Sequence, residues 1–397
     1  MHAPPTASRP RVALVHDFLL DVRGAERVFL EMCELWPDAT VFTAIYDEQG
    51  TEGRFAHRDV HTSFLQRLRP TARTFRPLLP LYPAAMESFE LQDFDLVVSS
   101  SSAWAHGVIC DERTPHVCYS HNPFRYAWND RDRTLASRRD PFTRAALRSV
   151  LHRWRQWDWI AAQRVDQYLA NSRTTQGRIR AYFGRDSRVV HPPVDTTRFS
   201  RRPVGDHYLV LSELMPHKRI DIAVRAFREL GLPLLVVGDG PEMRRLRALA
   251  GQGTKLLGRV SDAEVAELLG SCRALVVTAV EEFGIAAVEA QAAGRPVVAV
   301  SGGGLLETVL EGRTGCFWRG GPRELAQAVR DFEVDAVDPG DCEANAARFG
   351  RDVFRRELPR EVERALERRG REGPARPHGA VARSRARFVR RGRAFDR

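Results

Sequence analysis

The sequence predicts an α/β protein in which two Rossmann-like domains face a central cleft, and three observations lead to this prediction. Short runs rich in Val, Ile and Leu alternate with longer amphipathic segments, which is the pattern of parallel sheets covered by helices. Two such series follow one another, separated by a polar stretch at 196–206 that has no apolar period. The length of 397 residues suits two domains that each bury a core.

In the first series, the apolar run 11–18 is followed by a glycine turn at Gly24 and by a helical pattern over 25–36. Because strand–helix–strand repeats build parallel sheets, each series predicts one doubly wound domain. The other strands of the first series are expected at 39–46, 95–100, 116–121 and 167–172, and 189–195 is expected to be a strand that runs into a stiff connector. Those of the second series are expected at 208–214, 233–240, 255–260, 274–280 and 296–304.

These patterns divide the chain into four parts. We expect an N-terminal domain over 1–200 and a C-terminal domain over 205–345. A helix over 346–370 is expected to pack back on the N-terminal domain. Residues 371–397 contain Gly, Pro, Ala and Arg with few large apolar groups, so a basic, disordered tail is expected there.

The net charge of +10 is unevenly distributed. The tail holds nine arginines against two acidic residues, and 113–180 hold fourteen arginines against five aspartates. The rest of the chain is acidic, so the basic regions suit an anionic membrane surface or an anionic acceptor better than nucleic acid. DNA binding is the weakest alternative, and it predicts a steeply salt-dependent affinity that survives deletion of 371–397.

Composition also bears on the compartment and on metals. The six cysteines are scattered with no C-x-x-C pair, which fits a reducing cytoplasm and predicts no metal site. The pair Asp130 and Asp132 lies in an Arg-rich polar stretch rather than after a buried strand, so no metal role is expected for it either. No apolar run approaches the roughly 18–20 residues that span a bilayer, and residues 1–11 show no signal-peptide core. We expect a cytoplasmic protein, with a peripheral position on the inner face of the membrane as an alternative.

Residues 142–165 predict a long helix with two interpretations. Leu, Val and Trp recur at helical spacing, with arginines between them. One interpretation is an amphipathic helix packed on the N-terminal sheet. The other is a membrane-surface helix, with Trp at the interface and Arg toward anionic head groups.

The strongest local signal is EEFGIAAVEA at 281–290, which follows the buried run 274–280 and opens a helix. Glu281 and Glu289 can both line the cleft at the carboxyl end of a parallel strand, where ligands bind in open α/β sheets. The alternative is a helix N-terminus that merely favours acidic residues. A G-x-S-x-G elbow and a G-x-G-x-x-G fingerprint are both missing, which disfavours a serine hydrolase and an NAD enzyme.

This E-x7-E element resembles that of the family 4 retaining glycosyltransferases, which have the two-domain GT-B fold. The resemblance extends over roughly 10–370. Within the family, the chain looks most similar to bacterial O-antigen and exopolysaccharide mannosyltransferases. The strings that carry this resemblance are VHDFLLDVRGAERV, HTSFLQRL, YSHNPFRYAW, ANSR, HPPVD, MPHKRID and VVGDGPE.

The resemblance implies roles for individual residues. His121, Lys218 and Glu281 would be catalytic, with Lys218 on the donor diphosphate, where a point-charge ammonium suits a leaving phosphate. Arg125 and Tyr126 would hold the acceptor. Residues implied for donor binding are Gly24, Arg219, Gly238, Asp239, Gly258, Arg259, Val260, Glu289, Gly303, Gly304 and Leu305.

The chain departs from the family pattern at two places. The family has an arginine five residues before the lysine, and this chain has Glu213 there. A carboxylate beside a diphosphate repels it, and Arg219 is a candidate to offset that charge. A different donor-binding mode and weak activity are the alternatives. In the glycine-rich first loop, only Gly24 is retained.

The expected function is therefore transfer of a hexose to a glycan or lipid-diphosphate-linked acceptor in cell-surface polysaccharide synthesis. The resemblance implies a nucleotide-sugar donor, GDP-mannose first, with no further cofactor and no metal. Two alternatives stay open: a non-catalytic relative that binds a nucleotide sugar, and a nucleotide-sugar 2-epimerase.

Overall fold

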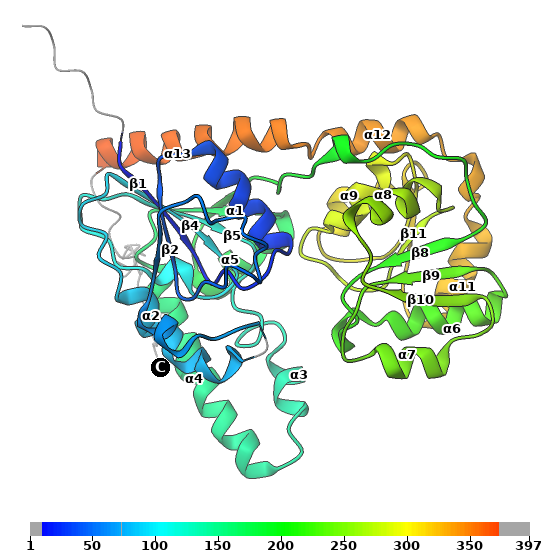
Figure 1. The fold of residues 1–397 in the computed structure, drawn as a ribbon, viewed down its shortest axis with the longest axis horizontal. Coiled ribbons are helices and arrows are strands. Elements are labelled where there is room, and N and C mark those ends of the chain that lie inside the picture. The colour runs from blue at the N-terminus through cyan, green and yellow to red at the C-terminus, as the bar shows by residue number, and fades with distance from the viewer. Residues whose placement is uncertain (1–9, 73, 373–397) are drawn as a thin grey trace, which may run out of the picture.

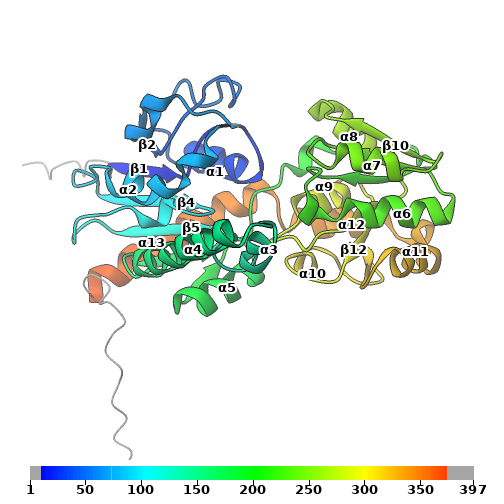
Figure 2. The ribbon, with the colours of Figure 1, turned by 90° about the horizontal axis from the view of Figure 1, so that it is seen from below.

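The computed structural model describes residues 10–72 and 74–372, which form two α/β domains side by side (Figures 1 and 2). Each domain is built on a fully parallel sheet with helices on both faces. The prediction of two Rossmann-like domains is confirmed. The expected tail, 371–397, lies outside the described residues from 373 onward.

The N-terminal sheet has seven strands in the order β3-β2-β1-β4-β5-β6-β7. Its strands are β1 (Val12–His16), β2 (Thr40–Thr43), β3 (Val60–Thr62), β4 (Leu96–Ser101), β5 (His116–Ser120), β6 (Gln167–Ala170) and β7 (Ser187–Val189). Its helices are α1 (Gly24–Leu35), α2 (Tyr82–Glu87), α3 (Arg131–Ala136), α4 (Pro141–Ala162) and α5 (Arg173–Phe183).

Strand β1 shows why the apolar runs are continuous. Val12 and Leu14 pack on one face of the sheet, in a cluster with α1, while Ala13 and Val15 pack on the other face, in a cluster with α2. A parallel strand buried on both faces has no solvent-facing side, so every position favours an apolar residue.

The C-terminal sheet has six strands in the order β10-β9-β8-β11-β12-β13. They are β8 (Tyr208–Leu211), β9 (Leu234–Val237), β10 (Thr254–Gly258), β11 (Leu275–Val277), β12 (Val297–Val300) and β13 (Gly315–Trp318). The helices are α6 (Ile220–Leu230), α7 (Met243–Leu249), α8 (Asp262–Ser271), α9 (Ile285–Ala292), α10 (Leu305–Thr308), α11 (Pro322–Asp331) and α12 (Pro339–Ala347).

The last helix, α13 (Arg351–Glu372), returns to the N-terminal domain (Figure 1). Phe354, Leu358 and Val362 join the same apolar cluster as β1 and α1. The two stretches of chain that connect the domains also touch, because Val194 N donates to Phe349 O at 2.9 Å. Residues 349–362 are therefore held against both domains.

Helix α4 has two different halves. Its C-terminal half packs on the domain, where Trp154 and Trp157 surround the buried Trp104. Its N-terminal half projects beyond the domain together with α3 (Figure 1), and Phe142 at its start is 84% exposed. No helix of the described residues combines the length and the apolar character needed to cross a bilayer.

The structure differs from the expected elements in a few places. In the run 189–195 the strand is shorter than expected, because β7 begins at Ser187 and ends at Val189. Pro192 and Pro193, which lack the N–H group that a ladder needs, belong to the connector that follows. Strands β3 and β13 were not expected from the sequence. In β3, two of the three residues are polar, and β13 is an apolar run of only 4 residues, so neither gives a long apolar run.

Candidate functional site

Except for Gly24, the residues expected to bind the donor lie at or after the carboxyl ends of five neighbouring strands, β8 to β12. In a parallel sheet these ends share one edge. Contacts between the loops confirm their proximity: Gly238 N donates to Gly258 O at 2.8 Å, and Leu214 N donates to Asp239 O at 3.0 Å. This edge faces the N-terminal domain, as the ion pairs described below show.

Lys218 and Glu281 form the centre of this edge. Lys218 ends the 3-10 turn η5 (Pro216–Lys218), and its Nζ lies 2.8 Å from both carboxylate oxygens of Glu281. Thr278 Oγ1 donates to Lys218 O at 2.7 Å and so holds the turn against the end of β11. Both charged side chains are about one-fifth exposed, so a ligand anion can compete with Glu281 for the ammonium.

The glycine loop lies directly on the Glu281 turn. Gly304 N donates to Glu281 O at 2.9 Å. A Cβ on Gly303 would lie 2.2 Å from Glu281 O, and one on Gly304 would lie 2.3 Å from Glu282 O. Only glycine allows this approach, which packs the N-terminus of α10 against the backbone of Glu281 and Glu282. Leu305, the first residue of α10, is fully buried in the core.

Glu289 lies one turn into α9, on the same edge. Burial raises the pKa of its carboxyl, and the positive charges of Arg27 and Arg198 offset only part of that effect. Within the described residues no hydrogen bond or ion pair to this carboxylate is found. A half-buried acceptor of this kind is suited to bind ligand hydroxyls.

Two other expected donor residues are exposed. Asp239 and Arg259 follow β9 and β10, and Val260 beside them is half-buried against the core. Arg219 has a left-handed backbone, with φ of 53°, and its guanidinium lies 3.6 Å from Asp221. Within the described residues Arg219 forms no ion pair with Glu213, and its role in offsetting the Glu213 charge at a bound diphosphate stays a prediction.

Glu213 pairs instead with the opposite domain. Its Oε1 lies 2.6 Å from Nη1 of Arg23, which also binds Asp21. Burial lowers the pKa of Arg23, but Glu213 and Asp21 outweigh it and the pKa is raised. Arg23 immediately precedes α1, so the first loop places a guanidinium next to Glu213, the residue that replaces the arginine of the family pattern.

Gly24 begins α1 and lies against the C-terminal domain. A Cβ on Gly24 would meet Ile285 Cδ1 at 3.4 Å, so the N-termini of α1 and α9 face each other. Both helix ends carry partial positive charge, which suits an anion between the domains.

His121 follows β5 on the N-terminal side. Its Nε2 lies 2.9 Å from Ser100 Oγ, and burial lowers its pKa to about 3, so the ring is neutral at physiological pH. Tyr126 packs edge-on against Phe124 and is 43% exposed, and the structure does not bring it into contact with the C-terminal loops.

Arg125 joins the two domains. Its Nη2 donates to Glu282 Oε1 at 2.7 Å and its Nη1 lies 3.2 Å from His217 Nε2. Arg178 donates to the same oxygen of Glu282 at 3.1 Å. Burial raises the pKa of Glu282, but the two arginines outweigh that effect and the pKa is lowered.

Sequence reasoning missed Glu282, Arg178, Arg23 and Glu307. Glu307 accepts the backbone N–H of Arg173 at the start of α5, at 2.9 Å. The sequence shows Glu282 as the second glutamate of the EE pair at 281–282. Its partners Arg125 and Arg178, however, lie more than a hundred residues away along the chain. Nothing in the sequence signals such distant partners.

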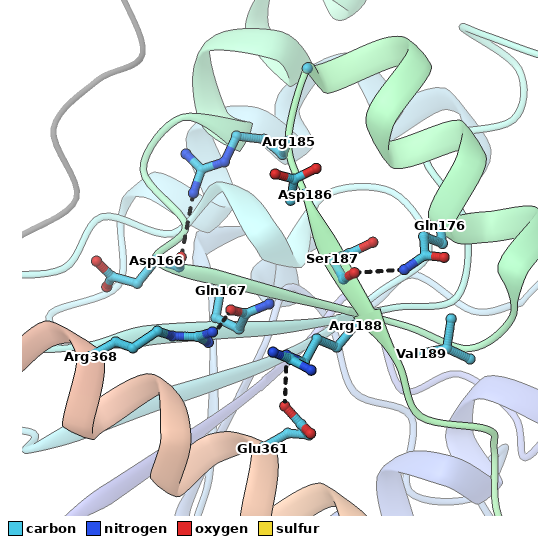
Figure 3. Close-up of a pocket in the computed structure, with 11 residues that line it drawn as sticks. Asp166, Gln167, Gln176, Arg185, Asp186, Ser187, Arg188, Val189, Glu361 and Arg368 are labelled. Atoms are coloured by element: carbon cyan, nitrogen blue, oxygen red, sulfur yellow. Dashed lines mark hydrogen bonds and ion pairs between the residues drawn. The ribbon is translucent and has the colours of Figure 1, made fainter.

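A polar cavity lies at another place, between α13 and the edge strand β7 (Figure 3). It is lined at the amino ends of β6 and β7, away from the interdomain edge, and none of the expected site residues lines it. Arg188 there lies 3.5 Å from Glu361. Within 10–72 and 74–372, no group of three His, Cys, Asp or Glu residues is arranged to hold a metal ion.

Comparison with family models covers both domains. Residues 22–198 match the model described as Glycosyltransferase Family 4, and 206–333 match that described as Glycosyl transferases group 1. Together the two matches span more than half of the chain.

Among individual relatives, a GDP-mannose-dependent α-(1-6)-phosphatidylinositol monomannoside mannosyltransferase of Mycolicibacterium smegmatis is 33% identical over 199 residues. That match covers 41% of this chain and 52% of the relative. A D-inositol 3-phosphate glycosyltransferase of Streptomyces avermitilis is 32% identical, over 48% of each chain. The chain thus spans about half the length of the curated relatives it matches.

Among solved structures, HepE of Anabaena in complex with UDP-glucose has a TM-score of 0.65 at 19% identity. The match covers 89% of this chain and 99% of that one. Sucrose-phosphate synthase of Thermosynechococcus elongatus has a TM-score of 0.71 at 15% identity, over 91% and 100% of the two chains. At these identities the likeness establishes the two-domain GT-B fold alone.

Proposed function

The chain belongs to the family 4 glycosyltransferases, and we propose that it is a retaining enzyme that moves a hexose from a nucleotide sugar onto a glycan or lipid-linked acceptor. The observation that carries the proposal is the Lys218–Glu281 pair, held beside the glycine loop where two helix N-termini meet. A cation, free N–H groups and two helix dipoles together can stabilise a departing diphosphate.

The proposed reaction proceeds on one face of the sugar. The bond between the anomeric carbon and the phosphate oxygen breaks, and the electron pair leaves with the diphosphate. The acceptor oxygen bonds to the same face and its proton passes to the departing phosphate oxygen. Lys218 and the amide of Gly303 stabilise the leaving charge, while Glu281, released from Lys218, binds sugar hydroxyls.

GDP-mannose is the donor we favour. The relative that uses GDP-mannose supports this choice, whereas the structural neighbour with UDP-glucose supports a nucleotide sugar in general. In this proposal Glu289 binds the ribose hydroxyls, and the segment from Gly258 to Val260 contacts the base. The charge on the diphosphate is met by residues of the chain, so activity in a chelator is expected to be unchanged.

We infer that the acceptor is presented at an anionic surface, as a lipid-linked diphosphate in cell-surface polysaccharide synthesis. The projecting α3–α4 hairpin supports this inference, because residues 131–150 hold six arginines against two aspartates. Phe142 is 84% exposed at its end. An exposed aromatic side chain among arginines suits the boundary of an anionic membrane.

The test of function is a screen of GDP-, UDP- and ADP-sugars. Binding of one donor should raise the melting temperature, because a ligand that binds only the folded state stabilises it. With that donor and a polyprenyl-diphosphate-linked glycan, NMR should show a product with the anomeric configuration of the donor. Binding without transfer or hydrolysis would favour the non-catalytic alternative, and an epimerised free sugar would favour a 2-epimerase.

A further inference from the structure

A line of buried polar side chains runs beneath the interdomain face of the N-terminal domain. His16 ends β1, Ser100 lies beside it on β4, and Glu26 stands in the first turn of α1. His16 is 2% exposed, Glu26 5% and Ser100 fully buried. Buried polar groups are costly unless they are paired, so this alignment calls for an explanation.

The contacts connect these groups end to end. One oxygen of Glu26 accepts the backbone N–H of Arg23 at 2.9 Å, and the other lies 3.6 Å from His16 Nε2. His16 Nδ1 lies 3.1 Å from Ser100 Oγ, and Ser100 Oγ lies 2.9 Å from His121 Nε2. The line therefore begins at the first loop and ends at His121.

The chemistry of each group sets the direction of the hydrogen bonds. Glu26 lies 3.6 Å from His16 Nε2, which is beyond hydrogen-bond distance, but a carboxylate attracts a proton and repels a lone pair, so it favours the tautomer of His16 with its proton on Nε2. In a neutral imidazole the other nitrogen, Nδ1, is then an acceptor, and Ser100 donates to it. The oxygen of Ser100 is left to accept from His121, whose proton therefore sits on Nε2.

The outer nitrogen of His121 is thus left with a lone pair. Within the described part of the chain, His121 Nδ1 has no hydrogen-bond partner, and it is not among the fully buried polar atoms. His121 is half-buried, and it lies four residues before Arg125, which reaches Glu282 in the other domain. An unpaired acceptor is therefore available on the interdomain side.

We propose that Glu26, His16 and Ser100 are positioning residues that fix the tautomer of His121, so that Nδ1 accepts a hydrogen bond from a hydroxyl group of the donor sugar or the acceptor. This inference rests on the proposed function for its ligand, but the tautomer itself is a property of the protein alone. A merely structural cluster would hold the four side chains without requiring one proton arrangement.

Glu26→Gln provides a sharp test. The amide oxygen must accept from Arg23 N–H, so the amide NH2 faces His16 and donates to its Nε2. Each bond then reverses: His16 donates from Nδ1 to Ser100, Ser100 donates to His121 Nε2, and the His121 proton moves to Nδ1. Nitrogen-15 NMR of the full-length protein at pH 8 reports this directly, without substrate.

Ser100→Ala should release His121 into a mixture of tautomers. Ser99→Ala is the matched control, because Ser99 on the same strand makes the equivalent 2.7 Å bond to His116 Nε2, which is not part of the line. With a donor that turns over, Ser100→Ala should lower kcat about tenfold with KM within about twofold, whereas Ser99→Ala should not.

Three results would overturn the inference. They are a wild-type His121 with its proton on Nδ1, a Glu26→Gln spectrum identical to that of the wild type, and equal responses of His121 to Ser100→Ala and Ser99→Ala. If the tautomer switches as described but no nucleotide sugar turns over, the positioning line stands and the proposed function fails, so the two can be told apart.

Discussion

The two domains meet with opposite charge. The C-terminal side presents carboxylates, and the N-terminal side presents guanidinium and backbone N–H groups. Pairs that cross the interface include Glu213 with Arg23, Asp262 with Arg27, Glu282 with Arg125 and Arg178, and Glu307 with the start of α5. The positive charge of the N-terminal side is already indicated by the sequence, because fourteen of the arginines lie within 113–180.

Because the two domains carry opposite charges at their interface, an anionic ligand can change how strongly they attract each other. A nucleotide diphosphate is itself anionic, so it competes with the C-terminal carboxylates for the same cations. Lys218 stands apart as a cation on the acidic side, paired within its own domain. Each variant described next changes a charge on one side of the interface between the domains.

The largest effect is expected from Lys218→Ala, which removes a cation from the acidic side. Losing a group that stabilises the departing diphosphate should lower kcat about 100- to 1000-fold. Lys255→Ala is the control, because Lys255 is exposed on the edge strand β10. Steady-state kinetics of both variants decide the matter, and equal activities would remove Lys218 from the mechanism.

Glu282→Gln breaks the most buried of the crossing pairs and should lower the free energy of unfolding by about 1.5 kcal/mol near neutral pH. Because the folded-state pKa of Glu282 is lowered, its contribution is present above the unfolded value near 4.5 and disappears as pH falls through the folded-state pKa. Urea unfolding from pH 7 to pH 3 should therefore show the two proteins converging. A constant difference across that range would contradict this role.

The Arg23–Glu213 pair joins the two domains at the position where this chain has Glu213 in place of the arginine of its family. Arg23→Ala should weaken donor binding and Glu213→Ala should strengthen it, each about two- to fivefold, because one removes attraction and the other repulsion. Both side chains are roughly half exposed, so a double-mutant cycle should give a coupling energy of only about 0.2–1 kcal/mol.

The matched control is the Arg330–Glu229 pair, which is similarly exposed but lies within the C-terminal domain. Substituting it should leave donor affinity unchanged. If both pairs change donor affinity equally, the effect is one of overall charge and not of the interface.

Features of this structure could be predicted from the sequence when the residues that form them are close together along the chain. Strand β1, the start of α9 and the glycine loop follow from local patterns, because burial on both sheet faces and close backbone approach leave a signature in neighbouring residues. The partners of Glu282 leave none, since Arg125 lies 157 residues away and arginines are frequent in this chain. Likewise, the line from Glu26 to His121 joins four parts of the chain, namely α1, β1, β4 and the end of β5.

The smallest effect is expected from Arg27→Ala. Arg27 and Asp262 are 39% and 54% exposed, and exposed pairs contribute about 0.2–1 kcal/mol. Its removal should lower the free energy of unfolding by less than Glu282→Gln does, measured by urea unfolding at the same pH. A larger loss would mean that the pair, rather than Glu282, anchors the domains.

We place the donor site at the carboxyl edge of the C-terminal sheet. The direct test of this assignment is calorimetric titration of the wild type, Glu289→Ala and Glu267→Ala with GDP-mannose, or with the donor that the screen selects. Glu267 is an exposed acid on α8 and serves as the control. We predict that Glu289→Ala weakens binding at least about tenfold, while Glu267→Ala binds as the wild type does. Equal affinity of all three proteins would contradict the assignment of the site.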